Sequence, residues 1–328
     1  LCRRNPHLEG RAGTVCVHVG PGFQRVALRF VNLGSGVKHV VDLSDAELAT
    51  TRALLDEYGL RVSSLGSPLG KVKLYDFEDG TSNRYVPFED YLAGDVEKTC
   101  RAAKALGTRL IRGFTFYPPR GSDPRGQLPL AVRQLRQIAD ICTGHELILG
   151  LELEAHLVGR DGLLLAEIFD RLRHPDVVLV FDPANLVVQG YGPDEVWSHF
   201  EAVRPGLGWL HVKDCLRPVG LENASELNEE QISGFVPAGL GDGALTRIFD
   251  DLRVQGTETI VRMTRKGVPG ILLELEPHLR GGGQFGGTSG ADGFGVAFRH
   301  CTALLDAAGL TYRLTDWPDL RHRSNVAQ

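Results

Sequence analysis

The chain has 328 residues, of which 42% are apolar and 23% charged, enough apolar side chains for a core in one large domain or two ordinary ones. The formal net charge of −5, with both signs mixed along the chain, argues against a nucleic-acid-binding protein, which usually carries a basic surplus. No apolar run is long enough to cross a membrane, and no apolar segment follows the basic first residues as in a secretion signal. We therefore expect a cytoplasmic protein that binds neither nucleic acid nor membrane.

Apolar segments alternate with amphipathic ones from residue 25 onward. Ser44 and Glu47 fit a capping box at the start of a helix that ends near Tyr58. Gly107 is typical of a helix C-terminus, and Pro193 of a first helical turn. The further helices are expected at Phe88–Leu106, Leu128–Thr143, Gly162–Arg173, Ala244–Gln255 and Gly293–Ala308. The predicted strands are Arg25–Val31, Leu60–Gly66, Thr108–Phe114, Glu146–Glu154, Val177–Asp182, Leu207–Lys213 and Gly270–Glu276.

This alternation, at roughly thirty residues per unit, predicts an α/β protein with a parallel sheet, closed as a (β/α)₈ TIM barrel if an eighth strand is present. The eighth strand must come from residues 1–24, where Thr14–Val19 is the best candidate. Too few residues separate Val19 from Arg25 for a helical crossover, so the first βα unit is expected to be truncated or irregular. The predicted organisation is an irregular N-terminal segment (1–24), the barrel (25–310) and a C-terminal tail (311–328). Residues 217–237 and Gly281–Gly290 are predicted loops.

Charged or imidazole side chains end four of these apolar strands. They are Glu154, Asp182, His211 and Glu276. The first three lie roughly one βα unit apart, which predicts that their strands are neighbours and that the side chains meet at the C-terminal mouth of the barrel. Carboxylates and an imidazole suit Mn²⁺, Mg²⁺, Co²⁺ or Zn²⁺, and ligand type alone does not choose among these ions.

Strand alternation places Glu152 and Glu274 one layer deeper in the barrel. A buried carboxylate needs a partner, and Arg112 and Lys213 are the expected ones. Lys213 has a second reading, in which it holds a substrate oxygen. His156 is either a substrate contact or a hydrogen-bonded histidine at the rim.

Asn185 is likewise either a substrate contact or a turn residue after Pro183.

The order Glu154-x-His156, Phe181-Asp182-Pro183-Ala184-Asn185, His211-Val212-Lys213-Asp214 and Leu275-Glu276-Pro277-His278 resembles the sugar phosphate isomerase/epimerase family with the xylose-isomerase-like barrel. The segments Val62–Lys71, Gly239–Asp242 and Gly287–Gly290 are also similar to that group. The resemblance covers roughly residues 25–310 and is not specific about the substrate. The usual first strand and helix of the family are not recognisable in residues 1–24.

The resemblance implies one divalent ion, expected to be manganese with magnesium, cobalt or zinc as alternatives, bound by Glu154, Asp182, His211 and Glu276. It also implies that Glu154 and Glu276 transfer protons next to a metal-polarised carbonyl, through an enediolate. His156, Asn185, Lys213 and Arg112 are the expected substrate contacts.

Three functions remain open. They are sugar isomerisation or epimerisation, metal-dependent β-elimination of the inosose dehydratase or C-glycoside deglycosidase type, and a non-catalytic barrel that binds sugar or a subunit. A repair endonuclease shares the barrel but needs several zinc ligands and a basic face, and the sequence has neither. The expected partner is a small carbohydrate, with a homo-oligomer or a hetero-oligomer with a small partner subunit as possible assemblies.

Overall fold

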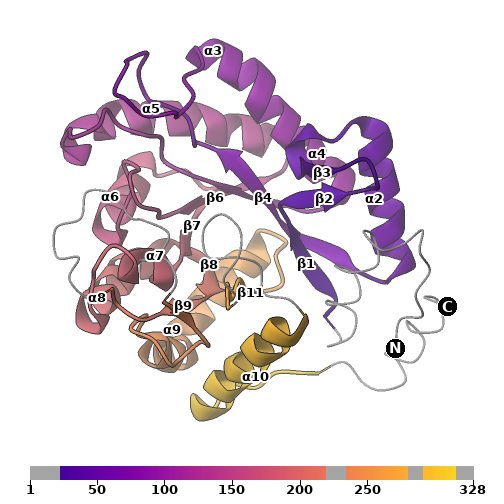
Figure 1. Cartoon of the computed structure of the whole chain (residues 1–328), viewed down its shortest axis with the longest axis vertical. Coiled ribbons are helices and arrows are strands. Elements are labelled where there is room, and N and C mark those ends of the chain that lie inside the picture. The colour runs from indigo at the N-terminus through magenta and orange to yellow at the C-terminus, as the bar shows by residue number, and fades with distance from the viewer. Residues whose placement is uncertain (1–22, 219–233, 280–290, 315–328) are drawn as a thin grey trace.

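The computed structural model describes residues 23–218, 234–279 and 291–314. A parallel sheet of seven strands, in the order β1-β4-β5-β6-β7-β8-β11, curves into a nearly closed barrel (Figure 1). Its strands are β1 (Arg25–Leu28), β4 (Arg61–Leu69), β5 (Leu110–Gly113), β6 (Ile148–Glu152), β7 (Val177–Phe181), β8 (Leu207–Val212) and β11 (Leu272–Leu275). Each strand pairs in parallel with the next one along the chain, as right-handed βαβ units require.

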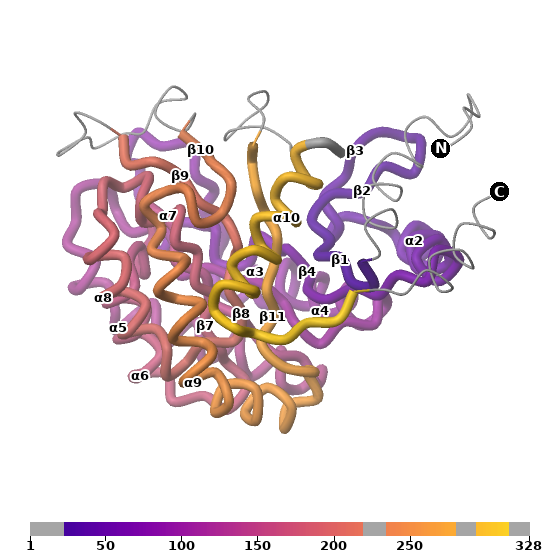
Figure 2. The backbone as a smooth tube through the Cα atoms, turned by 90° about the horizontal axis from the view of Figure 1, so that it is seen from below, coloured from indigo at the N-terminus to yellow at the C-terminus, as the bar shows by residue number. Residues whose placement is uncertain are grey.

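Helices surround this sheet on its outer side (Figure 1). They are α2 (Asp45–Glu57), α3 (Phe88–Tyr91), α4 (Glu97–Leu106), α5 (Pro124–Gly144), α6 (Gly162–Leu172), α7 (Pro183–Val187), α8 (Pro193–Val203), α9 (Leu245–Arg265) and α10 (Ala291–Ala307). Figure 2 shows the barrel from the side, with the loops that follow the strand ends at its upper edge. None of the helices in the described ranges has both the length and the hydropathy of a membrane span.

The seven predicted strands are all confirmed as members of one parallel sheet, and the α/β TIM barrel is the observed class. The strand predicted at Arg25–Val31 is too long. The sheet strand ends at Leu28, and β2 (Phe30–Asn32) turns away to pair antiparallel with β3 (Val37–His39). The predicted eighth strand, Thr14–Val19, lies outside the described residues.

Two other predictions need correction. The helix expected at Phe88–Leu106 is interrupted by a π-helical segment, Leu92–Val96, which contains Gly94, a residue with weak helix propensity. The loop expected at 217–237 lies mostly outside the described residues, but β10 (Phe235–Val236) pairs antiparallel with β9 (Asp214–Cys215) at the upper edge of the barrel (Figure 2). The glycine-rich loop predicted at Gly281–Gly290 lies outside the described residues.

The helix ends predicted at Ser44, Gly107 and Pro193 are confirmed. Ser44 and Glu47 form the full capping box, each side chain accepting from the other residue's backbone N–H. Gly107 ends α4 with a left-handed φ of 72°. Pro193 occupies the first turn of α8. These short-range contacts fix where helices begin and end, and hence which residues reach the strand ends.

Side chains inside the barrel separate into an apolar floor and a charged mouth. Towards the N-terminal ends of the strands, Leu110, Ile148, Val178 and Trp209 form a cluster that is distinct from the apolar layer between strands and helices. The buried Trp209 ring passes directly over Gly150, where an added Cβ would lie 2.5 Å from the ring carbon Cη2. The floor therefore closes the barrel from below, and the polar residues lie above it.

We predict that Gly150→Ala lowers the free energy of unfolding by about 1–3 kcal/mol, because the added methyl group would overlap the Trp209 ring in a packed core. Urea unfolding followed by circular dichroism measures this change. The matched control is Gly126→Ala in α5, where nothing lies within 4 Å of the added Cβ, and we expect it to raise stability by up to about 1 kcal/mol. Equal stability of the two variants would contradict the packing argument.

Candidate metal centre

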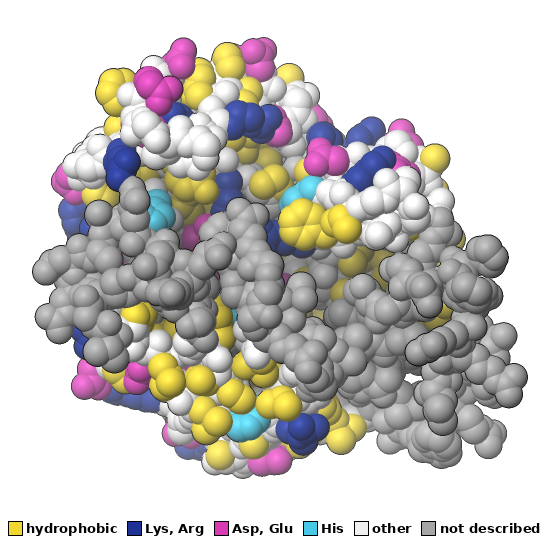
Figure 3. Space-filling model, viewed as in Figure 1, with side chains coloured by type: hydrophobic (Ala, Val, Ile, Leu, Met, Phe, Trp, Pro, Cys, Tyr) yellow, Lys and Arg dark blue, Asp and Glu magenta, His cyan; other side chains and the backbone are white. Residues whose placement is uncertain are grey.

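The strand ends that carry the predicted ligands lie side by side. Strands β6, β7, β8 and β11 are consecutive in the sheet, so the residues at their C-terminal ends share one sector of the mouth. The predicted adjacency of the strands that carry or precede Glu154, Asp182 and His211 is therefore confirmed, and the strand that precedes Glu276 lies next to that of His211. Basic and acidic side chains appear next to one another towards the middle of this face in the space-filling view (Figure 3).

The imidazole of His211 is the centre of a group of carboxylates. Its Nδ1 atom lies 3.1 Å from Oε2 of Glu276, 3.4 Å from Oδ2 of Asp182 and 3.7 Å from Oε1 of Glu152. Glu152, Asp182 and His211 are buried, and one potential ligand atom from each lies within 4.8 Å of the others. Ligand atoms about 2.0–2.2 Å from one ion are roughly 3–4 Å apart, so these separations fit a single divalent ion.

The polar atoms of this group are incompletely satisfied within the described part of the chain. The Nε2 atom of His211 is buried and has no hydrogen-bond partner there, whereas Oε2 of Glu152, which also lacks a hydrogen bond, has an ion pair with Arg112 at 3.2 Å. Buried polar atoms are nearly always paired, and unpaired ones in a group of carboxylates and imidazole indicate a place for a ligand. The residues present therefore fit a divalent metal ion.

Two cations compensate the carboxylates of this group. The guanidinium of Arg112 lies 3.2 Å from Glu152, and the ammonium of Lys213 lies 2.6 Å from Asp182 and 3.1 Å from Glu276. Arg112 is the partner of the deep carboxylate of Glu152, as predicted. Lys213 pairs instead with Asp182 and Glu276, the two acids at the mouth. Glu274, the other deep carboxylate, accepts a hydrogen bond from Ser64 at 3.2 Å.

These contacts determine the charge of each group. Burial alone would raise the pKa of the Glu276 carboxyl, but the charges of Lys213 and His211 hold it well below its usual value. Burial opposes the charged form of His211, but the Glu152 carboxylate and its neighbours raise the pKa of that imidazole well above its usual value. Burial raises the pKa of Glu152, against the opposing effect of Arg112. The centre thus holds close, opposite charges shielded from solvent.

Glu154 lies at the rim, apart from the His211 group. Strand β6 ends at Glu152, so the alternation predicted up to His156 does not continue, and Glu154 forms an ion pair with Lys71 at 2.7 Å. His156 is exposed with a left-handed φ of 67°. Asn185 lies in α7 and donates to Glu152 at 3.3 Å and to the carbonyl oxygen of Leu153 at 3.1 Å. Asn185 therefore supports the deep carboxylate rather than serving only as a turn residue.

Asp214 has a role that its sequence motif did not reveal. Its carboxylate accepts hydrogen bonds from the backbone N–H groups of Gly239, Gly241 and Gly243 at 2.9–3.0 Å. An added Cβ at Gly241 would lie 2.4 Å from the carbonyl oxygen of Cys215, so this turn needs glycine. Asp214 and the turn Gly239–Gly243 are far apart in sequence, but together they form a clasp beside the mouth. The only sequence signal for this contact is the presence of both an acidic residue at a strand end and a glycine-rich turn.

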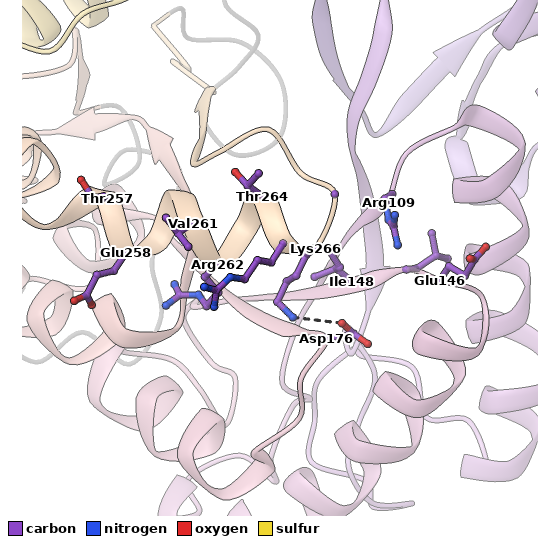
Figure 4. A pocket seen from close by; sticks show the side chains of 13 residues that line it. Arg109, Glu146, Ile148, Asp176, Thr257, Glu258, Val261, Arg262, Thr264 and Lys266 are labelled. Atoms are coloured by element: carbon purple, nitrogen blue, oxygen red, sulfur yellow. Dashed lines mark hydrogen bonds and ion pairs between the residues drawn. The ribbon is translucent and has the colours of Figure 1, made fainter.

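A hollow of about 880 Å³ lies at the opposite end of the barrel (Figure 4). Its lining comes from the N-terminal ends of β5, β6 and β7 and the C-terminal end of α9, including Arg109, Asp176, Arg262 and Lys266. Lys266 and Asp176 pair with each other at 3.3 Å. The only group of three or more metal-ligating side chains found in the described residues is at the mouth, so we place the chemistry there.

Comparison with known proteins agrees with the fold. The chain matches the xylose isomerase-like TIM barrel family over residues 21–282, and it belongs to that family. No curated protein is similar enough in sequence to match the chain.

Solved structures share its architecture. The probable 3-DHS dehydratase of Bacillus anthracis, involved in petrobactin synthesis, has 18% identity and a TM-score of 0.61, over 88% of this chain and 92% of that one. A xylose isomerase-like TIM barrel protein from Mycobacterium smegmatis in complex with magnesium has 17% identity and a TM-score of 0.58, over 89% and 86%. D-Psicose 3-epimerase from Clostridium cellulolyticum H10 has 14% identity and a TM-score of 0.51, over 90% and 91%. At these identities the likeness establishes the fold alone.

We predict that Arg112→Met lowers the free energy of unfolding by about 3–5 kcal/mol, because it leaves the buried Glu152 carboxylate without its cation. The double variant Arg112→Met/Glu152→Gln should recover most of that loss, since it removes both charges. Urea unfolding of the metal-free protein measures both effects. Arg125→Met, which removes the exposed pair with Glu167, is the control and should change stability by no more than about 1 kcal/mol. If Arg112→Met lowers the free energy of unfolding no more than the control does, the buried Glu152 carboxylate does not depend on Arg112.

Proposed function

We propose that this chain is a divalent-metal-dependent enzyme that moves a proton next to the carbonyl of a small sugar, as an isomerase or epimerase. The observation that carries the proposal is the buried group of Glu152, Asp182 and His211, joined by Glu276, at the mouth of a barrel of this family. Carboxylates and a histidine in that position are suited to a metal that polarises an oxygen.

Asp182, His211 and Glu276 would hold the ion, together with a carboxylate from the end of β6. The sequence favours Glu154 for that carboxylate, whereas the distances to His211 favour Glu152. When bound, the ion would act as a Lewis acid and acidify the C–H bond beside the substrate carbonyl. The low solvent exposure of the group strengthens every electrostatic interaction there.

Glu154 and Glu276 are the proposed acid/base pair. Both side chains keep some access to solvent, 31% for Glu154 and 25% for Glu276, so each can reach a substrate in the mouth. They follow the ends of β6 and β11, which are separated by the two strands β7 and β8, and this separation lets them approach a substrate from different sides. Glu276 is ionised because Lys213 holds its pKa down, as a proton-accepting base requires.

Lys213 and Arg112 have supporting roles in this proposal. The Lys213 ammonium lies between Asp182 and Glu276 and can stabilise negative charge that develops on a substrate oxygen. Arg112 compensates Glu152 from below and fixes its position. The exposed His156 is a candidate for contact with the distal part of a sugar.

The second candidate is metal-dependent β-elimination, in which the same deprotonation is followed by loss of a leaving group. A probable 3-DHS dehydratase among the structural neighbours supports it, because a dehydratase eliminates water from its substrate. Solvent-deuterium exchange without loss of a group favours the isomerase. Loss of water or of an aglycone from inososes or 3-oxo-glycosides favours the elimination.

We predict that His211→Ala and Asp182→Asn each lose the bound ion, since each removes a ligand from a site with few alternatives. Metal content by mass spectrometry after dialysis against Mn²⁺ or Mg²⁺ measures this. Comparison of Glu152→Gln with Glu154→Gln in the same assay decides which carboxylate of β6 binds the ion. The control is His145→Ala, an exposed histidine paired with Glu97 at 2.8 Å on the outer helices. Wild-type protein that binds no ion under these conditions would overturn the proposal.

We predict that Glu154→Gln and Glu276→Gln each lower turnover by about 100-fold or more, because a general base contributes at least that much. A panel of ketoses, inososes and 3-oxo-glycosides, followed by deuterium exchange in D₂O, measures turnover. Glu97→Gln, on α4 and outside the barrel, should leave it unchanged. Full activity in either acid/base variant would exclude this mechanism.

A further inference from the structure

The carboxylate of Glu276 presents its two oxygens to different neighbours. Oε2 lies 3.1 Å from Nδ1 of His211 and 3.1 Å from Nζ of Lys213, so this oxygen is turned to the ligand group. Oε1 lies 3.6 Å from Nε2 of His278 instead. The side chains of Glu276 and His278 are 25% and 22% exposed, so their contact lies at the border between the buried group and solvent. The oxygen left for proton transfer is therefore the one beside His278.

His278 takes a backbone conformation that few residues other than glycine adopt. Its φ is 46°, in the left-handed region, where a residue with a Cβ is strained. The buried Pro277 before it disfavours helical backbone at Glu276, which keeps Glu276 in line with β11. Strained conformations persist where surrounding contacts fix them, and they are frequent at functional sites. The backbone thus sets the direction of the His278 side chain.

An aromatic ring from a separate segment holds the ring of His278. The centroids of the Phe235 and His278 rings lie 5.2 Å apart, with an interplanar angle of 37° between them. Aromatic rings at this separation attract each other beyond the area that they bury. Phe235 lies in β10, and the β9–β10 ribbon lies next to the end of β11 in both views of the chain (Figures 1 and 2). The stack therefore restricts the His278 ring from outside its own segment.

The ribbon that carries Phe235 is itself attached to the end of β8. Phe235 pairs with Cys215 of β9, which follows β8 almost directly. The clasp of Asp214 on the turn Gly239–Gly243 holds both ends of the ribbon. A continuous set of contacts thus runs from the end of β8 through Phe235 to His278, and it gives the clasp a consequence for the mouth.

These contacts matter because the other neighbours of Glu276 hold only one of its oxygens. His211 and Lys213 both contact Oε2, so a rotation of the carboxylate about that oxygen displaces Oε1 without breaking either contact. Proton transfer requires the accepting oxygen within hydrogen-bond reach of its partner, and a misplacement of about 1 Å can cost on the order of 100-fold in rate. His278 is the described side chain that contacts Oε1.

We propose that His278 is a positioning residue that holds Oε1 of Glu276 in place for proton transfer, and that Phe235 keeps the His278 ring in the orientation that this requires. The inference rests on the proposed function, in which Glu276 accepts the proton. His278 acts through Glu276 and takes up no proton in this role.

The first test needs no activity and compares crystal structures of the full chain. His278→Asn tolerates the left-handed backbone but is too short for the contact, whereas the amide nitrogen of His278→Gln reaches the place of Nε2. We expect a single Glu276 conformation in the wild type and in His278→Gln, and a displaced or divided Oε1 in His278→Asn. Phe235→Leu should release the His278 ring and displace Oε1 as well. An unchanged Glu276 in His278→Asn refutes the proposal.

The second test measures turnover of ketoses, inososes and 3-oxo-glycosides by deuterium exchange in D₂O. We expect His278→Asn to lower kcat by about tenfold or more, with KM and the content of Mg²⁺ within about twofold of the wild type. His278→Gln should recover most of the loss. Phe235→Leu should lower kcat less, and the double variant Phe235→Leu/His278→Asn no more than His278→Asn alone, because both substitutions act through one ring.

The matched control is Phe30→Leu, which removes the ring that contacts His39 at 5.1 Å in the β2–β3 hairpin and should leave kcat unchanged. Loss of Mg²⁺ or a rise in KM alone in His278→Asn contradicts the proposal, since His278 would then bind the ion or the substrate. So does a His278→Gln variant that is as slow as His278→Asn although its backbone is unchanged. If His278→Asn does not fold, Phe235→Leu is read in the same way.

Failure of the proposed function gives a different result. A wild type that turns over none of the compounds rejects that function, and the crystal structures still decide whether His278 orders Glu276.

Discussion

A carboxylate inside a protein needs a cation within reach, and the upper half of this barrel is arranged around that requirement. Glu152 is nearly inaccessible to solvent, and Arg112 from the adjacent strand lies 3.2 Å away. Asp182 is fully buried and depends in the same way on Lys213, two residues beyond His211. Because removal of one member leaves the other charge unpaired in a low dielectric, the members of each pair are energetically tied to each other. The candidate metal centre is therefore also a condition for the stability of the mouth.

This arrangement divides the barrel along its axis. Below the charged layer, Trp209 and the aliphatic side chains around it exclude water and support the strands. Above it lie the strand ends that carry the charged residues. The separation explains how one chain can bury a full core and still hold opposite charges close together, since the apolar floor keeps water from reaching the charges from below.

Glycines make room for the large inner side chains. Gly150 lies under the Trp209 ring, and an added Cβ at Gly208 would come within 2.4 Å of Val178. Gly66 leaves space beside Arg29 at the mouth. In each case a small residue on one strand is matched by a large one on its neighbour, which is how a barrel interior reaches normal packing density.

The sequence by itself determined the elements, their order and the end of the barrel at which the polar residues gather. Strand periodicity, the Ser44–Glu47 capping box and Gly107 depend on neighbours within a few residues, so they can be read along the chain. The tertiary structure decided which side chains meet. Glu152, not Glu154, comes within 3.7 Å of His211, because β6 ends at Glu152 and the chain turns before the next alternation. Lys71 and the clasp of Asp214 on its glycine-rich turn went unassigned because their partners are far from them in sequence. Contacts of that kind depend on register and on where each strand ends, and these are set by packing across the whole barrel rather than by any local pattern.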